Sequence, residues 1–100
     1  MDEAGNRIAK GVVIPAMSEH VRRELFWVIR NQRASNTPVE TGQTFKRLLA
    51  EGFDEQEALE MLAAVLLCEM RETVIRGGHD EKRYVGWMNR LRDMSFLDEG

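Results

Sequence analysis

The sequence predicts an all-α fold: a compact four-helix bundle or orthogonal array around a central apolar helix at about residues 55–76, preceded by an irregular N-terminal segment. The first observation is the run Met61–Cys68, because a helix that is apolar on every side has to be enclosed by its neighbours. The second is a pair of boundary signals. Asp54 and Glu57 have capping-box spacing, and Gly77 can end a helix in a left-handed conformation. The third is the helical spacing of apolar residues in three further segments.

The overall composition indicates one ordinary globular domain. The chain has 100 residues, of which 43% are apolar and 31% are charged, and this differs clearly from the composition of disordered proteins. No linker or internal repeat divides it. We expect a flexible or extended segment over residues 1–17, a single four-helix domain over residues 18–95 and a loose tail over residues 96–100.

Charge, hydropathy and cysteine content narrow the class of protein. A net charge of −3 argues against a nucleic-acid partner, since binding to phosphates depends on concentrated Lys and Arg. The chain lacks the run of about 20 apolar residues that a membrane span needs, and no apolar signal-peptide region follows Met1. One cysteine cannot form an internal disulfide, so we expect a reduced, cytoplasmic protein without a cofactor.

The first helix is expected to begin after the N-cap residue Ser18 and to run to about Ala34. Its inner stripe consists of Val21, Leu25, Val28, Ile29 and Gln32. On nearly the opposite side, Trp27 stands beside Arg23, Arg30 and Asn31.

Three interpretations of Trp27 are open. A short extended segment is predicted over Val12–Ile14, and with no sheet to join it would lie across a helical surface and could cover the indole. The indole could instead anchor a partner interface, because Trp and Arg are enriched in binding hot spots. Simple exposure to solvent is the third interpretation.

The second helix is expected to begin at a capping box, Thr37-Pro38-Val39-Glu40, and to run to about Glu51. Its predicted inner stripe is Thr41, Phe45, Leu48 and Leu49, with Gln43, Lys46 and Arg47 facing outward. Asp80 is expected to cap a fourth helix of about 14 residues. The inner residues of that helix would be Tyr84, Trp87, Met88, Leu91 and Met94.

Few ionisable residues have a spacing that suggests chemistry. His20 and Glu24 lie four residues apart and could contact one metal ion, but the sequence supplies no third ligand, so we assign no metal site. His79 is typical of a loop histidine, with a catalytic base as the alternative. Cys68 is interpreted as a small buried side chain, with a reactive thiol as the alternative.

Glu69 needs a partner. It lies in line with Leu62 and Leu66 on the inner side of the central helix, where an unpaired carboxylate is costly. We expect a salt bridge or hydrogen bond to an arginine, to Tyr84 or to Trp87 on a neighbouring helix. A catalytic acid with a raised pKa is the alternative interpretation.

Several short motifs follow one another over residues 22–91. They are Ile29-Arg30-Asn31-Gln32, Pro38-Val39-Glu40, Arg47-Leu48, Gly52-Phe53-Asp54, Val65-Leu66 with Glu69, and Asp80-Glu81 with Tyr84 and Leu91. In their order and spacing the chain resembles a family of small bacterial all-helical proteins classed as a domain of unknown function. The resemblance implies an all-helical fold, and it implies no biochemical activity.

Members of that family often carry histidine pairs on helices one and three that look like metal ligands. The matching positions here are Arg22 and Phe26, then Gln56 and Glu60, which cannot reproduce such a site. A metal role in relatives therefore does not carry over to this chain.

Without a convergent set of reactive groups, we interpret the chain as a non-enzymatic protein–protein interaction or self-association module. The predicted contact surface is the outer face of helix one, and the partner is another protein or a second copy of the chain. This surface consists of Arg23, Trp27, Arg30 and Asn31, to which Val12–Ile14 could add. The alternative is a small-ligand or metal-binding protein, or an enzyme, that uses His20, Glu24, Glu60 and Glu69.

Overall fold

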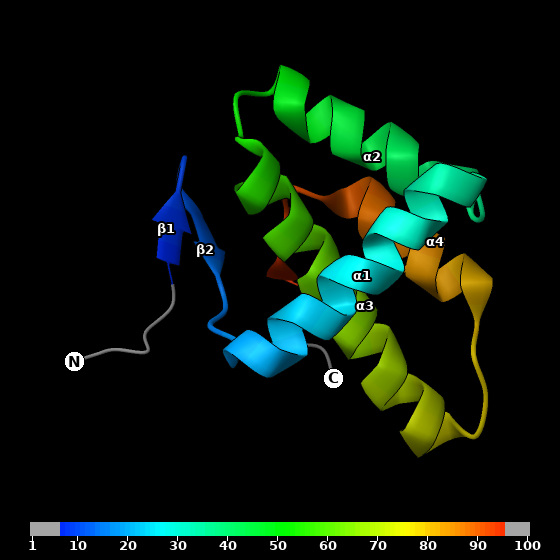
Figure 1. The fold of residues 1–100 in the computed structure, drawn as a ribbon. Coiled ribbons are helices and arrows are strands. Elements are labelled where there is room, and N and C mark those ends of the chain that lie inside the picture. The colour runs from blue at the N-terminus through cyan, green and yellow to red at the C-terminus, as the bar shows by residue number, and fades with distance from the viewer. Residues whose placement is uncertain (1–6, 96–100) are drawn as a thin grey trace.

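A computed structural model describes residues 7–95 and confirms the all-α four-helix prediction (Figure 1). Residues 1–6 and the tail predicted over residues 96–100 lie outside the described part. The elements in chain order are β1 (Arg7–Ala9), β2 (Val12–Ile14), α1 (Glu19–Ser35), α2 (Val39–Ala50), α3 (Glu55–Arg76) and α4 (Glu81–Arg90). The helices cross one another rather than running side by side, so the orthogonal array is the alternative that the structure adopts (Figure 1).

α3 is the central helix, and α1, α2 and α4 all pack against it. Its N-terminus has the predicted capping box. The Asp54 side chain accepts from the Glu57 amide at 2.8 Å, and the Glu57 side chain accepts from the Asp54 amide at 2.9 Å. At the other end Gly77 adopts a left-handed conformation, with φ of 83°. Leu62 and Val65, in the middle of the helix, are completely buried.

The last third of α3 is less enclosed than predicted. Leu67, which belongs to the apolar run, is exposed, and so are Met70, Val74 and Ile75, which follow the run. A helix of 22 residues is about 33 Å long, whereas the 12 residues of α2 and the 10 of α4 reach only about 18 and 15 Å, so neither can cover its whole length. The C-terminal end of α3 therefore projects beyond its neighbours (Figure 1). Among the helices of residues 7–95, none is long and apolar enough to cross a membrane.

α1 packs across α3 through the predicted inner stripe. Its N-cap is Ser18, as expected, and the Ser18 hydroxyl accepts from the Val21 amide at 3.2 Å. Leu25 and Ile29 are buried. α1 ends at Asn36, whose left-handed conformation lets its amide bond back to the last turn.

The N-terminus of α2 differs from the prediction of a capping box. Pro38, not Thr37, is the N-cap residue, and no side chain accepts from the first-turn amides. The Thr37 hydroxyl donates instead to the Ser35 carbonyl at 3.1 Å and stabilises the turn out of α1. As a result, the positive end of the α2 dipole has no side-chain cap.

α4 is shorter than predicted and ends at Arg90, because Leu91 is in an extended conformation. The reason lies on α2. The Arg47 guanidinium, predicted to face outward, turns in and donates to the Met88 carbonyl at 3.1 Å and to the Leu91 carbonyl. The Met88 carbonyl also accepts from the Leu91 amide at 3.1 Å, so Arg47 adds a partner from another helix to the carbonyls at the end of α4.

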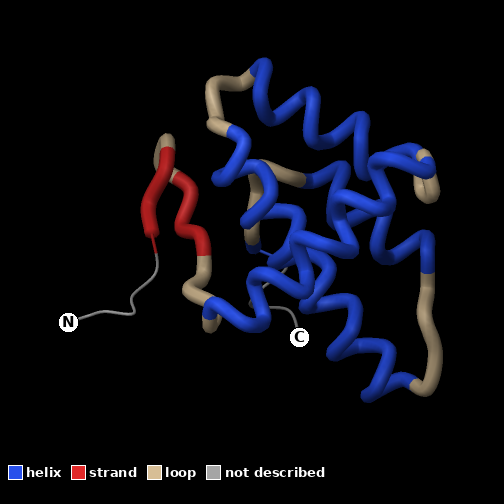
Figure 2. Tube along the Cα trace, viewed as in Figure 1, coloured by secondary structure: helices blue, strands red, loops and turns tan. Residues whose placement is uncertain are grey.

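The N-terminal segment is more regular than predicted, because β2 does pair with a strand. β1 and β2 form an antiparallel hairpin beside the helices, with Ala9 opposite Val12 (Figure 2). Lys10 and Gly11 form its two-residue turn with positive φ, the conformation that suits a tight hairpin. Val12 and Ile14 pack towards α3, as expected for a segment that lies across a helical surface.

Candidate functional site

The outer face of α1 is open to solvent. Trp27 is 66% exposed, and Arg23, Arg30 and Asn31 are also exposed. The hairpin packs on α3 and does not cover the indole, so the first interpretation of Trp27 is wrong. A large exposed aromatic side chain within a set of arginines is unusual for a surface without a partner.

Several polar side chains of this face are bonded to the helix itself or lie against it. The Asn31 amide donates to the Trp27 carbonyl at 2.7 Å, and the Ser35 hydroxyl donates to the Asn31 carbonyl at 2.9 Å. The Arg30 guanidinium lies 5.8 Å from the centre of the Phe26 ring, within cation–π range. The buried stripe on the opposite side of α1 fixes the direction in which these groups point.

A cleft of 580 Å³ continues this face towards α2. It is lined by Arg30, Arg33, Ala34, Asn36, Val39, Gly42, Gln43 and Lys46. Three of these residues are cations and none is acidic. Within the described part of the chain, none of the three cations has a carboxylate within 4 Å. The cleft therefore concentrates positive charge in a protein whose net charge is −3.

Sequence reasoning placed Lys46 on the outside of α2 but did not connect it with α1. The two helices bring Lys46 and Arg33 to one cleft, and the spacing of residues along the chain does not encode how the helices cross. Arg33 is held by stacking, because its guanidinium lies 3.6 Å from the centre of the buried Phe45 ring.

A second hollow, of 230 Å³, lies at the other end of the face. It is lined by Glu19, Arg22, Arg23, Phe26, Arg30 and Gln56. Glu60 accepts from Arg22 at 3.5 Å and from Gln56 at 3.4 Å, so three of the four positions compared above with the histidine pairs of the bacterial family meet in space. They meet as a salt bridge and a hydrogen bond.

The alternative site of His20, Glu24, Glu60 and Glu69 is not assembled. His20 and Glu24 are exposed on α1. Glu60 and Glu69 are nine residues apart on α3, a rise of about 13 Å, whereas metal–ligand bonds are about 2 Å long. Among residues 7–95, no three His, Cys, Asp or Glu side chains are grouped so that they could hold a metal ion.

An apolar groove of 520 Å³ lies beside the exposed end of α3. It is lined by Pro15, Ala16, Met17, Ala64, Leu67, Cys68, Met70, Arg71 and Val74. Cys68 is buried, as predicted for a small apolar side chain, and burial raises the pKa of its thiol. The thiolate is therefore disfavoured at neutral pH, which argues against a nucleophilic role.

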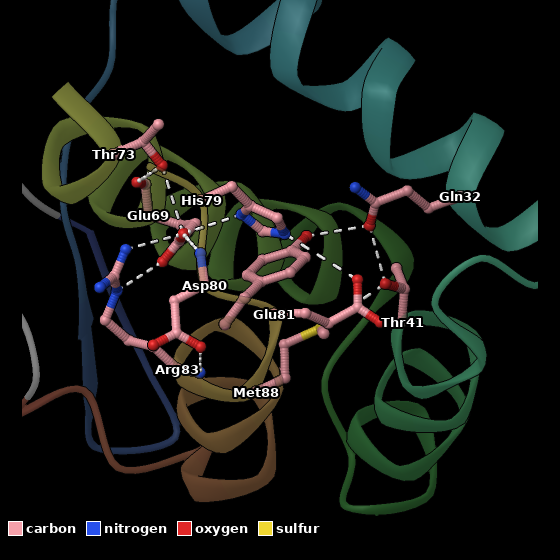
Figure 3. Close-up of polar contacts among 10 residues, drawn as sticks. Gln32, Thr41, Glu69, Thr73, His79, Asp80, Glu81, Arg83 and Met88 are labelled. Carbon is pink, nitrogen blue, oxygen red and sulfur yellow. Dashed lines mark hydrogen bonds and ion pairs between the residues drawn. The ribbon is translucent and has the colours of Figure 1, made fainter. Parts of the chain in front are cut away.

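Glu69 is buried, and its partners join α3 to α4 (Figure 3). The Arg83 guanidinium donates to both carboxylate oxygens, at 2.8 and 2.9 Å. The Asp80 amide donates at 3.0 Å, and the His79 ring nitrogen lies 2.8 Å away. The expected salt bridge to an arginine on a neighbouring helix is thus confirmed, with Arg83 as the arginine and His79 in the predicted loop.

The pKa of Glu69 lies below its usual value. Burial by itself raises this pKa, but the hydrogen bonds from Arg83, the Asp80 amide and His79 together lower it by more than burial raises it. A carboxylate with a lowered pKa is ionised at neutral pH, so Glu69 is not the catalytic acid of the alternative interpretation.

We expect Glu69 to make the fold sensitive to acid. Because the folded-state pKa is lowered, ionised Glu69 contributes stability above its unfolded pKa of about 4.3, and this contribution is lost as the pH falls through the folded pKa. This contribution is measured by denaturant unfolding of the parent and of Glu69→Gln at a series of pH values. The difference in free energy of unfolding between the parent and Glu69→Gln should shrink below about pH 4. A difference that stays constant with pH would contradict the lowered pKa of Glu69.

A second buried network, which sequence reasoning missed, joins α1, α2 and α4 (Figure 3). The Gln32 side-chain oxygen accepts from the Tyr84 hydroxyl at 2.9 Å and from the Thr41 hydroxyl at 2.8 Å. Burial raises the pKa of Tyr84 to about 12, although the hydrogen bonds with Gln32 and Thr41 lower it. The phenol is therefore neutral and acts as a structural donor.

Replacing Tyr84 by Phe should lower the free energy of unfolding by about 1 kcal/mol, because one buried hydrogen bond is lost while the Gln32 oxygen keeps Thr41 as a donor. Thr41→Val alone should have a similar cost. The double variant should lose more than the sum, since it leaves that oxygen unsatisfied. Strict additivity in denaturant unfolding would show that the oxygen is not shared.

Comparisons with known proteins do not assign a class. A scan of protein-family models finds no match to this chain, and searches of curated proteins and of solved structures find none either. The resemblance to the bacterial helical family stays a prediction. The class that fold and surface define is an all-α domain with a tryptophan-bearing, positively charged helix face.

Proposed function

We propose that this protein is a non-enzymatic protein-interaction module whose outer α1 face docks an acidic segment of another protein. The docking surface comprises Arg23, Trp27, Arg30 and Asn31. Burial of the indole would supply most of the affinity, and the arginines at its edge would supply charge-assisted hydrogen bonds. The cytoplasmic location predicted from the sequence stays a prediction.

The observation that carries the proposal is the 66% exposure of Trp27 on a helix whose opposite side is buried. Tryptophan and arginine are the residues most enriched among binding hot spots. The Asn31 side chain is already held by its bond to the Trp27 carbonyl, so its ordering would cost little conformational entropy on docking.

The charges of this face favour an acidic partner over a second copy. In an antiparallel pair of α1 helices centred on Trp27, Arg23 of one copy would stand against Arg30 of the other, because the two residues lie on the same edge of the helix, one heptad apart. Such juxtaposition of like charges is unfavourable. An acidic segment would instead meet Arg23 and Arg30 on this edge, one before and one after Trp27 along the helix, while the exposed Glu24 lies on the opposite edge.

Selection of random phage-displayed peptides on the full chain tests the chemistry of the partner. We expect the selected peptides to combine Asp or Glu with an apolar anchor, and their binding to weaken with added salt as exposed charges are screened. Selected peptides without acidic residues, or binding that is insensitive to salt, would contradict the proposal.

Sedimentation separates the two kinds of partner. The parent and Trp27→Glu should both sediment as monomers at high protein concentration, because the proposed partner is a different protein. A dimer of the parent that Trp27→Glu abolishes would show that the face serves self-association and that the acidic-partner proposal is wrong.

A further inference from the structure

We propose that the cleft between α1 and α2 is a binding site for a doubly charged oxyanion, namely a phosphoryl group. The cleft adjoins the docking surface, with Arg30 common to both. The proposal names a group that the docked segment would carry, and in that respect it rests on the proposed function. The site itself requires only the cleft.

The charge of the cleft is the first argument. Arg30, Arg33 and Lys46 all line it, and the described residues provide no carboxylate in the lining and no ion pair to any of the three. One carboxylate would neutralise one of the three cations. A phosphoryl group at pH 7 carries −1.5 to −2 charges and about three acceptor oxygens, and arginine clusters are the usual means of binding it.

The N-terminus of α2 is the second argument. Val39, the first residue of this helix, lines the cleft, and no side chain caps the first turn, although the Thr41 amide donates to the Pro38 carbonyl at 3.2 Å. The acidic residue of this turn, Glu40, is not part of the lining. Helix N-termini bind anions through such amides and through the helix dipole. At the C-terminus of α1, whose residues Ala34 and Asn36 also line the cleft, the Asn36 and Thr37 amides donate to the carbonyls of Arg33 and Gln32.

The site is also pre-organised and open. Stacking of Arg33 on the Phe45 ring holds that guanidinium in place before any ligand arrives. Gly42 lies in the lining, and a Cβ added there would meet nothing within 4 Å. The cleft therefore has room for a group of atoms at the position of Gly42.

Gly42 also supplies the test, because a side chain placed there can carry a charge into the cleft without a clash. Gly42→Glu would provide an internal carboxylate that competes with an anion. Gly42→Ala is the matched control, which changes the backbone in the same way and leaves the charge unaltered.

The experiment is a titration of the full chain with inorganic phosphate, followed by amide chemical shifts and run at constant ionic strength against sodium chloride. We expect saturable shifts confined to about residues 30–46. The dissociation constant should rise about tenfold or more in Gly42→Glu and in Lys46→Gln, and should stay within about twofold in Gly42→Ala. Lys82→Gln, a change at an exposed position on α4, should also leave it unchanged.

Shifts that are spread over the surface without saturation, or that are equally strong in Gly42→Glu, would overturn the proposal. A stable fold in each variant is verified by the amide spectrum itself, so a loss of binding cannot be mistaken for unfolding.

A second arm distinguishes the two sources of the phosphoryl group. If the phosphoryl group belongs to a docked segment, a phosphoserine peptide with an apolar anchor should bind more tightly than free phosphate. Trp27→Ser should then lower the affinity for the peptide to that for free phosphate and leave the affinity for free phosphate unchanged. If the peptide and free phosphate bind with equal affinity, and Trp27→Ser changes neither affinity, the cleft is a site for a free phosphate compound. That result would contradict the protein-docking function. If neither probe binds at the cleft while acidic peptides still bind at Trp27, the phosphoryl site is wrong and the docking function stands.

Discussion

Replacing Leu62 with alanine is expected to lower the free energy of unfolding by about 3–5 kcal/mol, the largest effect of any variant considered for this chain. Leu62 lies in the middle of α3 and is completely buried. Its removal loses the transfer free energy of the missing atoms and leaves a cavity, because three helices hold the surrounding side chains in place. Denaturant unfolding followed by circular dichroism measures the loss.

Val74→Ala is the matched control on the same helix. Val74 is 84% exposed at the end of α3 that projects beyond its neighbours, so its truncation should change the free energy of unfolding by less than about 0.5 kcal/mol. If the two variants were equally destabilised, another element would have to cover the end of α3, and the described arrangement of helices would be wrong.

Replacing Glu69 with alanine should lower the free energy of unfolding by about 3 kcal/mol. The carboxylate binds Arg83, the Asp80 amide and His79, and thereby fixes the start of α4 against α3. Its removal leaves several donors without their acceptor, including a guanidinium that is mostly buried. The measurement is again denaturant unfolding at neutral pH.

Glu81→Gln is the control for this second prediction. Glu81 is exposed and lies 3.9 Å from the His79 ring, so the loss of its charge should have an effect of less than about 0.5 kcal/mol. A small effect of Glu69→Ala, equal to that of Glu81→Gln, would mean that the Glu69 network does not connect the two helices.

The helices and their inner stripes could be predicted from the sequence because they depend on neighbours along the chain. Asp54 and Glu57 are three residues apart, and the capping box that they form needs no other element. In the same way, Leu25 and Ile29 are buried as their helical spacing predicts.

Two errors are local, namely the capping box expected at Thr37 and the missed hairpin turn, and the others concern contacts between distant elements. Arg47 looked like a surface residue, but it binds the carbonyls at the end of α4, 41 and 44 residues away. The exposed end of α3 depends on the relative lengths and crossing of several helices, and the apolar run that ends at Cys68 carries no information about these. A signal for the hairpin was present in Lys10-Gly11, between apolar residues, but Lys is not a preferred residue of such turns.

One part of the candidate site could be predicted from the sequence and the other could not. A helical wheel places Trp27 opposite Leu25 and Ile29, so the outer face of α1 could be predicted from α1 alone. The cleft could not, since Arg33 and Lys46 meet only through the packing of α1 on α2.

The central claim is that the outer face of α1 is the docking surface. Its most direct test is the affinity of one selected acidic peptide for two variants. Trp27 and Val74 are both exposed apolar residues on helices, so Trp27→Ser and Val74→Ser are closely matched. We predict that Trp27→Ser weakens binding about 30-fold or more, the effect of losing a hot-spot residue, and that Val74→Ser leaves it within about twofold. Unchanged affinity in Trp27→Ser, or an equal loss in Val74→Ser, would contradict the claim.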